Sequence, residues 1–223
     1  MILSRETTQV LQNFQTINPS IVIREGNVLR TMSSTEAVFA KAVVPDEFPR
    51  TVAVYDLSKF LGILSLTKDD SEIDFQEKSM IISQGNSTVQ YAYCPEELID
   101  SPPAGKDIKA KDIVVSFQLT NEVWTQVTKA MHILGFQEVA FCGTDGLLTV
   151  EALSTRNESS DTFSTELGDT DVDFQCVIDT EKMRLISDDY TVNIMEKNGA
   201  HLAHFKGSIA EYWIAISTKS WFK

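Results

Sequence analysis

The stretch that decides the fold is AVYDLSKFLGILSLTKDD, residues 53–70. It reads as the end of a strand, then Asp56, whose carboxylate is a favoured helix N-cap, then a short and largely apolar helix. Gly62 lies in the middle of this helix, where glycine costs about 1 kcal/mol relative to alanine. Two explanations are open: a large partner passes close to Gly62, or another helix packs tightly against it.

The same order of residues returns in the second half of the chain. VYDLSK, residues 54–59, aligns with VIDTEK, residues 177–182, so that each copy ends a strand with Asp and places Lys three positions later. Both predicted helices also run into an Asp-Asp pair, at residues 69–70 and 188–189. The second helix is about one turn shorter. A repeat of about half the chain predicts a duplicated domain.

The rest of the chain supplies two longer helices and many strand-like segments. Ser4 is a predicted N-cap of a helix that reaches Ile17, and a second helix is predicted over residues 120–135, with Gly135 as its C-cap. Around these four helices lie short alternating segments, many joined by glycine-containing turns. We therefore predict an α+β fold of two similar domains, with helices on one side and antiparallel sheets on the other.

A change in composition marks the boundary between the domains. Residues 95–112 contain three prolines and mixed charges with little periodicity, which is typical of a connector. The predicted domains are therefore residues 1–94 and 113–223. Leu98 and Ile99 are apolar residues within this connector, and they either border a pocket for a partner or anchor the loop to its own domain.

Composition excludes several classes of protein. With 223 residues, 43% of them hydrophobic, the chain can bury a substantial core, and it contains no apolar run long enough to span a membrane. Three widely spaced cysteines predict a reducing compartment. No phosphate-binding glycine loop, nucleophile elbow or metal-ligand spacing is present, so we expect neither an enzyme nor a bound metal or cofactor.

The net charge of −13 argues against a conventional DNA-binding protein, but the few bases are not placed at random. Most acids fall on predicted strands and loops, while several bases fall on the exposed stripes of the predicted helices. Sparse bases on one side would suit a surface that slides on DNA without reading its sequence. The predicted DNA-facing residues are Arg5, Lys59, Lys68, Lys129, His132 and Lys182. For His132 an ordinary place on the helix surface is an equal alternative. Arg184 receives less weight, since a helix would point it away from Lys182.

Two segments carry a resemblance to a known family. LSRETTQVLQNFQTIN, residues 3–18, followed by YDLSKFLGILSLTKDD, residues 55–70, closely resembles the sliding clamps of T-even-type bacteriophages, which are DNA polymerase processivity factors. The match is clear through about residue 95. Beyond that it depends on length, repeat order and scattered matches such as LGD at residues 167–169.

The resemblance implies a DNA-clamp fold and a homotrimeric ring with helices around the hole and sheets at the rim. It implies that duplex DNA passes through the hole, that a clamp loader ATPase opens the ring, and that a C-terminal peptide of the polymerase enters an apolar pocket. It further implies a role in late transcription and a place in the host cytoplasm. Gln12 departs from the expected pattern, because a basic residue would be expected on that stripe of the first helix.

Three other expectations remain open. A virion or assembly protein with a duplicated α+β domain, or an enzyme with an unrecognised site, would explain the repeat without any DNA. If the chain does form a ring, edge strands are natural joints between subunits, because their unpaired backbone groups seek partners. STVQYAYC, residues 87–94, is one candidate edge.

Overall fold

The computed structural model describes residues 1–66, 71–103, 108, 112–153, 161–197 and 200–223. Lys68 and the Asp pair at residues 69–70 therefore lie outside the described residues, as does the predicted turn at residues 198–199. The chain divides into two compact units, residues 1–106 (unit 1) and residues 107–223 (unit 2). The division falls inside the stretch predicted to connect two domains.

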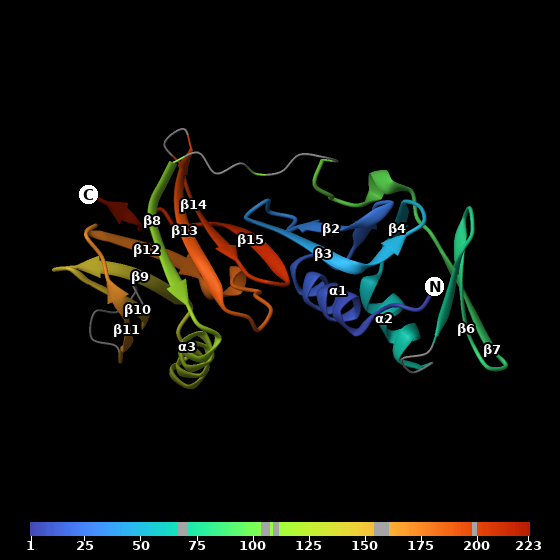
Figure 1. Cartoon of the computed structure of the whole chain (residues 1–223), viewed down its shortest axis with the longest axis horizontal. Helices are drawn as coiled ribbons and strands as arrows, with labels where there is room; N and C mark the ends of the chain where they lie inside the picture. The colour runs from blue at the N-terminus through green and yellow to red at the C-terminus, as the bar shows by residue number, and fades with distance from the viewer. Residues whose placement is uncertain (67–70, 104–107, 109–111, 154–160, 198–199) are drawn as a thin grey trace. The chain divides into compact units, whose positions relative to one another are not determined.

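Unit 1 combines two helices with short antiparallel sheets (Figure 1). Its strands pair as β1-β4, β2-β3 and β5-β6-β7. Its elements are α1 (Arg5–Ile17), β1 (Ile21–Ile23), β2 (Gly26–Met32), β3 (Val38–Phe48), β4 (Val52–Val54), α2 (Leu57–Leu66), β5 (Glu72–Phe75), β6 (Ser79–Gln84), β7 (Ser87–Ala92) and the single 3-10 turn η1 (Glu96–Leu98).

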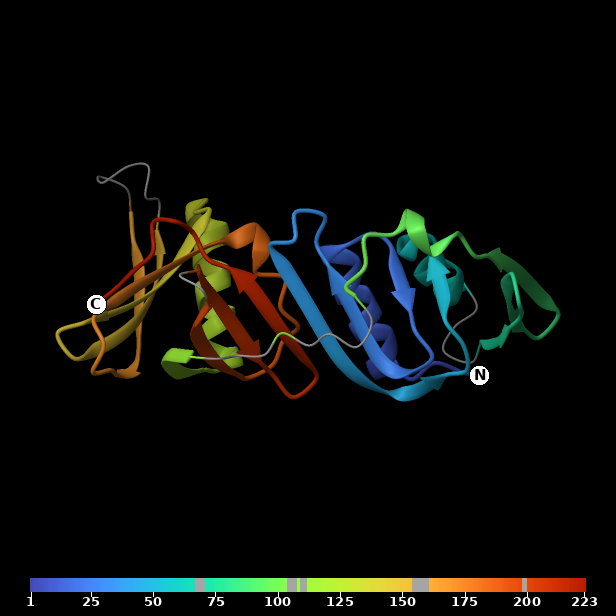
Figure 2. The ribbon, with the colours of Figure 1, turned by 90° about the horizontal axis from the view of Figure 1, so that it is seen from above.

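The core of unit 1 lies between its helices and its strands. Helix α1 packs on β2 and β3 and also contacts α2 (Figures 1 and 2). Val10 and Phe14 of α1, Leu29 of β2 and Phe60 of α2 are each 1% exposed or less. The helical spacing predicted from the sequence therefore places the apolar stripes of both helices inward.

Helix α1 begins where predicted, and a strand residue reinforces its cap. The Thr7 backbone N–H donates to Ser4 Oγ at 3.1 Å, which is the predicted N-cap bond. In addition, Asp46 of β3 accepts hydrogen bonds from the Ser4 backbone N–H at 2.8 Å and from Thr7 Oγ1 at 2.5 Å. Burial alone would raise the pKa of the Asp46 carboxyl, but the hydrogen bonds from Thr7 and Ser4 outweigh it and hold the pKa below its usual value.

Replacing Asp46 with Asn should destabilise unit 1 by about 1–3 kcal/mol, because the two donors lose a charged acceptor. Since the pKa of Asp46 is lowered by folding, its contribution is present above the unfolded pKa and is lost as pH falls through the folded pKa. Urea unfolding between pH 3 and pH 7 measures both effects. The difference in free energy of unfolding between wild type and Asp46→Asn should shrink toward pH 3. A difference that stays constant from pH 3 to pH 7 would contradict a stabilising role for the charged Asp46 carboxylate.

Unit 2 contains one long helix and two antiparallel sheets (Figure 1). One sheet has the order β11-β10-β9-β12-β16, and in the other β13 lies between β8 and β14, which in turn pairs with β15. The elements are β8 (Asp112–Leu119), α3 (Asn121–Leu134), β9 (Glu138–Thr144), β10 (Leu147–Leu153), β11 (Phe163–Asp169), β12 (Phe174–Asp179), the 3-10 turn η2 (Thr180–Lys182), β13 (Tyr190–Lys197), β14 (Ala200–Lys206), β15 (Ala210–Ala215) and β16 (Trp221–Phe222).

Local signals again fix the ends of the elements of unit 2. Helix α3 starts at an N-cap, since the Val123 backbone N–H donates to Thr120 Oγ1, and it ends at Gly135 with a φ of 71°. The β9–β10 hairpin turns at Asp145 and Gly146, both with positive φ, so that Leu147 pairs with Thr144. The end of the helix at Gly135 and the glycine-containing turn agree with the predictions from the sequence, whereas Thr120 was predicted inside the helix and is instead its N-cap.

The prediction of a fourth helix, after Asp179, is wrong. The chain makes only the single 3-10 turn η2 there, and Asp179 forms no capping hydrogen bond. Tertiary contacts explain the difference, because both backbone groups of Ile186 form hydrogen bonds to tyrosines. The Ile186 N–H donates to Tyr212 Oη at 3.2 Å, and Tyr190 Oη donates to the Ile186 C=O at 2.6 Å. A helix of this length is marginal, and these bonds compete with its ladder.

The three cysteines act as small apolar side chains. Cys142 and Cys176 are buried, Cys94 is half-buried, and all three are free thiols. Burial, with a smaller effect from Glu151, raises the pKa of the Cys142 thiol to about 12 and so keeps it protonated at neutral pH. Within the described residues, no helix has the length and apolar character that crossing a membrane requires.

Candidate nucleic-acid interface

Helix α1 exposes a polar face that carries a single cation. Arg5, Gln9 and Gln12 are exposed, and they lie on the side of α1 opposite its buried stripe. Arg5 is thus on the predicted face, and Gln12 supplies a neutral amide where a basic residue was expected. This face can donate hydrogen bonds to an anion, but it contributes little charge.

Helix α2 is fixed by Asp56, and this leaves Lys59 free to face solvent. The Lys59 backbone N–H donates to Asp56 Oδ1 at 2.8 Å, which confirms the predicted cap. Tyr91 Oη in turn donates to the Asp56 carbonyl at 3.0 Å and so holds the start of α2 against β7. The Lys59 side chain is exposed, as a DNA-facing residue requires.

Gly62 is exposed, and a Cβ atom built on it would meet nothing within 4 Å. Tight packing of another helix among the described residues therefore does not explain the glycine. Approach of a partner from outside remains the open explanation.

We expect Gly62→Ala to stabilise unit 1 by about 0.5–1 kcal/mol, because alanine gains helix propensity and meets no obstruction. Thermal or urea unfolding of the variant measures the change. A destabilised variant would show that the position is constrained in a way the described contacts do not reveal. If the variant is more stable but loads poorly on DNA, the glycine serves a partner.

Helix α3 carries the second group of predicted residues. Lys129 and His132 are both exposed, and because they are three positions apart they share one face of α3. Trp124, Val127 and Met131 are buried on the inner face, whereas Leu134, which the helical spacing also places on this face, is 37% exposed. The structure thus brings Lys129 and His132 together on the surface of unit 2.

Lys182 has a different environment from the one predicted. With no helix around it, its Nζ lies 2.6 Å from Asp179 Oδ2 and 3.5 Å from the Ala215 carbonyl, and the side chain is 21% exposed. This pairing with Asp179 offsets its charge locally. Arg184, which the helical reading pointed away, instead lies beside α3 together with Lys129. Lys68 lies outside the described residues.

The connector residues Leu98 and Ile99 separate into two environments. Ile99 is 7% exposed and packs with Val22, Ala53 and Cys94, so it anchors the connector to unit 1. Leu98 is 62% exposed and is open to a partner. In both ribbon views this stretch runs along β1 and β4 (Figures 1 and 2).

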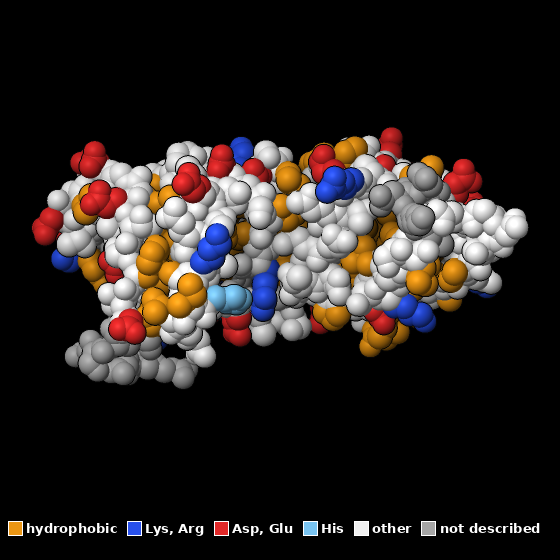
Figure 3. All heavy atoms as spheres, turned by 90° about the horizontal axis from the view of Figure 1, so that it is seen from below, with side chains coloured by type: hydrophobic (Ala, Val, Ile, Leu, Met, Phe, Trp, Pro, Cys, Tyr) orange, Lys and Arg blue, Asp and Glu red, His pale blue; other side chains and the backbone are white. Residues whose placement is uncertain are grey.

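Positive charge is sparse on the surface that carries the helices. On the face viewed in Figure 3, few Lys and Arg side chains are visible, and several of them lie next to Asp or Glu side chains. Among the described residues no group of His, Cys, Asp or Glu is arranged to hold a metal ion. His201 stacks on Phe222, and His204 stacks on Trp213 and bonds to Glu211. The geometry favours weak contact with an extended anion.

Comparison with known proteins decides the family. Residues 4–98 match the family described as DNA polymerase processivity factor, and residues 116–218 match the C-terminal domain of the gp45 sliding clamp. The sliding clamp of Vibrio phage KVP40 is 32% identical over 221 residues, which are 96% of this chain and 98% of the relative. The chain belongs to the sliding clamp family. This clamp is therefore a DNA polymerase processivity factor, and its family is not one of enzymes.

Other comparisons agree along the length of the clamp. The sliding clamp of Enterobacteria phage T4 is 29% identical over 235 residues, covering 99% of this chain and 98% of the relative. Among solved structures, A. fulgidus PCNA bound to the C-terminal region of FEN-1 superposes with a TM-score of 0.68 at 15% identity, covering 99% and 98% of the two chains. The PCNA of Thermococcus kodakaraensis gives 0.66 at 14% identity, covering 96% of each. These structures confirm the predicted clamp fold.

The sequence missed part of the polar surface of the clamp. Gln9, Thr125 and Arg184 line grooves beside α1 or α3, and none of them was predicted as a functional residue. The sequence did contain a signal for Gln9 and Thr125. Each lies five positions after the N-cap of its helix, Ser4 or Thr120, so the two have equivalent positions in the repeat. No local signal marked Arg184, since its position depends on the missing helix.

Proposed function

We propose that three copies of this chain close head to tail into a ring that encircles duplex DNA and tethers the replicative polymerase during phage DNA replication. The observation that carries the proposal is the duplicated unit: each unit begins its helical layer with a capped helix whose exposed face is mostly polar, with acidic and basic residues that offset each other. A virion protein would have no need for such a face to be repeated. The match to phage clamps along the whole chain supports the same function.

Ring closure requires two different surfaces that complement each other. Among the described strands, β7 is an edge of the three-stranded sheet of unit 1, and β11 is an edge of the five-stranded sheet of unit 2. Strand β7 carries no charge, whereas β11 carries Glu166 and Asp169. We propose that β7 of one copy pairs with β11 of the next.

The DNA contacts proposed for the ring are those predicted from the sequence, with unequal support. Arg5, Lys59, Lys129 and His132 are exposed on helices, which supports a place on the inner surface. Lys182 is the weakest of the described set, because Asp179 already pairs with it. Residence on DNA then depends on ring opening rather than on phosphate contacts, and tethering raises the local concentration of polymerase at the primer end.

The proposed protein partners are a C-terminal peptide of the polymerase, a clamp loader ATPase and late-transcription factors. The exposed Leu98, beside the anchored Ile99, is a candidate contact for a peptide. The A. fulgidus PCNA structure, which contains the C-terminal region of FEN-1, supports a peptide as the kind of partner. We place the clamp in the cytoplasm of the phage's host.

Mass in solution tests the assembly directly. Size-exclusion chromatography with light scattering should give three times the 24.9 kDa subunit mass. A stable monomer or dimer at micromolar concentration would contradict the homotrimer and would favour the alternative of a virion or assembly protein.

A further inference from the structure

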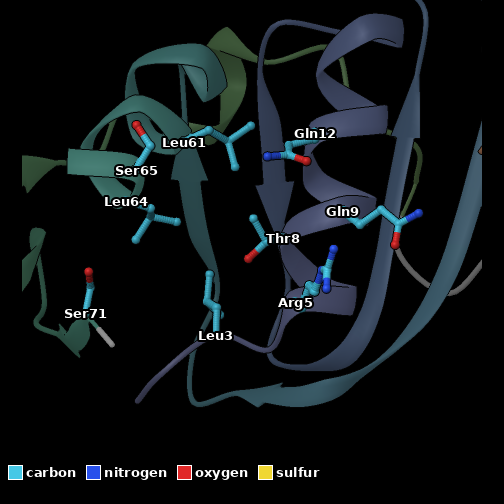
Figure 4. Close-up of a pocket in the computed structure, with 9 residues that line it drawn as sticks. All are labelled: Leu3, Arg5, Thr8, Gln9, Gln12, Leu61, Leu64, Ser65 and Ser71. Carbon is cyan, nitrogen blue, oxygen red and sulfur yellow. The ribbon is translucent and has the colours of Figure 1, made fainter. Parts of the chain in front are cut away.

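One groove lies beside the first helix of each unit, and the two grooves are similar in size. The α1 groove, of about 560 Å³, is lined by Arg5, Thr8, Gln9 and Gln12 of α1 and by Leu61 and Leu64 of α2. In Figure 4, Gln12 points from α1 toward Leu61, and Thr8 points toward Leu64. The α3 groove, of about 580 Å³, is bordered by Thr125, Lys129 and His132 of α3 and by Arg184 and Ser187 from the stretch where the fourth helix is missing.

The grooves occupy equivalent positions in the repeat. Counted from the N-caps Ser4 and Thr120, Gln9 corresponds to Thr125, and Gln12 corresponds to Thr128, which also lines its groove. Both units therefore present a hollow with a polar helix wall at the same place. Grooves of similar size and lining at equivalent places suit the same kind of ligand.

Each groove is short of charge but holds neutral donors. Among the described residues, Arg5 is the only ionisable side chain that lines the α1 groove, while Lys129 and Arg184 are opposed by Glu181 in the α3 groove. With His132 counted as neutral, the described lining of each groove thus has a formal charge of +1, in a chain whose net charge is −13. Gln9, Gln12 and Thr125 form no hydrogen bond through their side chains within the described structure, so these donors are available to a ligand.

We propose that both grooves receive the phosphate backbone of duplex DNA, and that neutral amide and hydroxyl donors make most of the contacts. Gln and Thr side chains are common partners of phosphate oxygens and carry no sequence information. Trp124 in the α3 groove is 8% exposed and offers no face for stacking, so unpaired bases are not the ligand. The inference rests on the proposed function, since it assumes that the helices face DNA.

Neutral contacts have a measurable consequence. Each phosphate neutralised by a cation contributes about 0.9 to the slope of log affinity against log salt, whereas a hydrogen bond from a neutral group contributes almost nothing. The clamp should therefore bind duplex weakly, with a shallow slope of roughly 1 for each groove in contact. A surface of this kind holds DNA in place without resisting its sliding.

Methyl NMR of the intact clamp, titrated with a blunt-ended DNA duplex, tests the location. Met131 and Met183 line the α3 groove, and Thr8 lines the α1 groove. Their methyl signals should shift with duplex concentration, while that of Met80, which is fully buried in β6, should not. If the methyl signals of the groove residues do not shift, although the clamp stays on circular DNA, the groove inference is overturned and the proposed function stands. A clamp that is not retained on circular DNA would instead overturn the function.

Gln12→Lys tests the neutral chemistry. A cation in the α1 groove should tighten duplex binding and steepen the salt slope by about 0.9 for each new phosphate contact. Asn27→Lys is the matched control, since Asn27 is also exposed, belongs to unit 1 and lines neither groove. The same gain in both variants would show unlocalised attraction and would overturn the proposal. No gain in Gln12→Lys, with a thermal melt like that of wild type, would do so as well.

Discussion

Most of the clamp loaded on nicked circular DNA is expected to remain bound through gel filtration, and most of it is expected to be lost within minutes once the circle is cut. The reason is the weakness of the contacts that the surface can make: the chain carries 32 acids against 19 bases, and the described lining of each groove has one net positive charge. Only a closed ring can then hold the protein on DNA. The measurement is the fraction of clamp that elutes with DNA before and after cutting.

Blocked ends provide the control for this experiment. When both ends of the linear DNA carry a bulky protein, retention should return to nearly the level seen with the circle, because the ring can no longer slide off. Equal loss from circular and linear DNA would contradict the topological mechanism. Equal retention on both would show that direct contacts hold the clamp, and the weak-contact account of the grooves would then be wrong too.

The second large effect is expected at the proposed joint. Val89 lies in the middle of β7, is half-buried within its own subunit, and pairs with Ile82 of β6. Val89→Asp would place a carboxylate opposite a β11 strand that already carries Glu166 and Asp169. Burying an unpaired charge beside like charges should cost about 3 kcal/mol at each interface, or roughly a 100-fold weaker association. Light scattering at micromolar concentration should then show monomers.

Two further variants make this test specific. Val89→Lys has the opposite charge and should weaken the ring less than Val89→Asp, since Glu166 and Asp169 can attract it. Ile113→Asp adds the same carboxylate to an exposed apolar position on β8, an edge strand of the other sheet of unit 2. It should leave the trimer intact. If Ile113→Asp dissociates the ring while Val89→Asp does not, the joint uses a different edge.

Much of the fold could be predicted because its signals are local. Ser4, Asp56 and Gly135 mark helix ends through bonds or backbone angles that span at most four residues. The apolar stripes of α1 and α3 follow the helical period, and most of each stripe is buried, although Leu134 at the end of α3 is exposed. The repeat order then indicated two similar domains before any contact was known.

The candidate site was less predictable, because its charges depend on distant partners. The helical reading put Lys182 on an open stripe and discounted Arg184, whereas the structure pairs Lys182 with Asp179 and places Arg184 beside Lys129. From the sequence, Gln12 was a departure from the basic residue expected at its position. In the structure, Gln12 has the place in the α1 groove that Thr128 has in the α3 groove.

The sequence alone determined the helices α1, α2 and α3, the duplication and the family, since each depends on residues close together in the chain or on a pattern read along it. The tertiary structure alone decided that the segment after Asp179 is not a helix and that a groove lies there instead. The cause is the pair of hydrogen bonds that Tyr190 and Tyr212 make to the backbone of Ile186. Bonds from other strands outweigh a weak local propensity, and no pattern within the segment announces them.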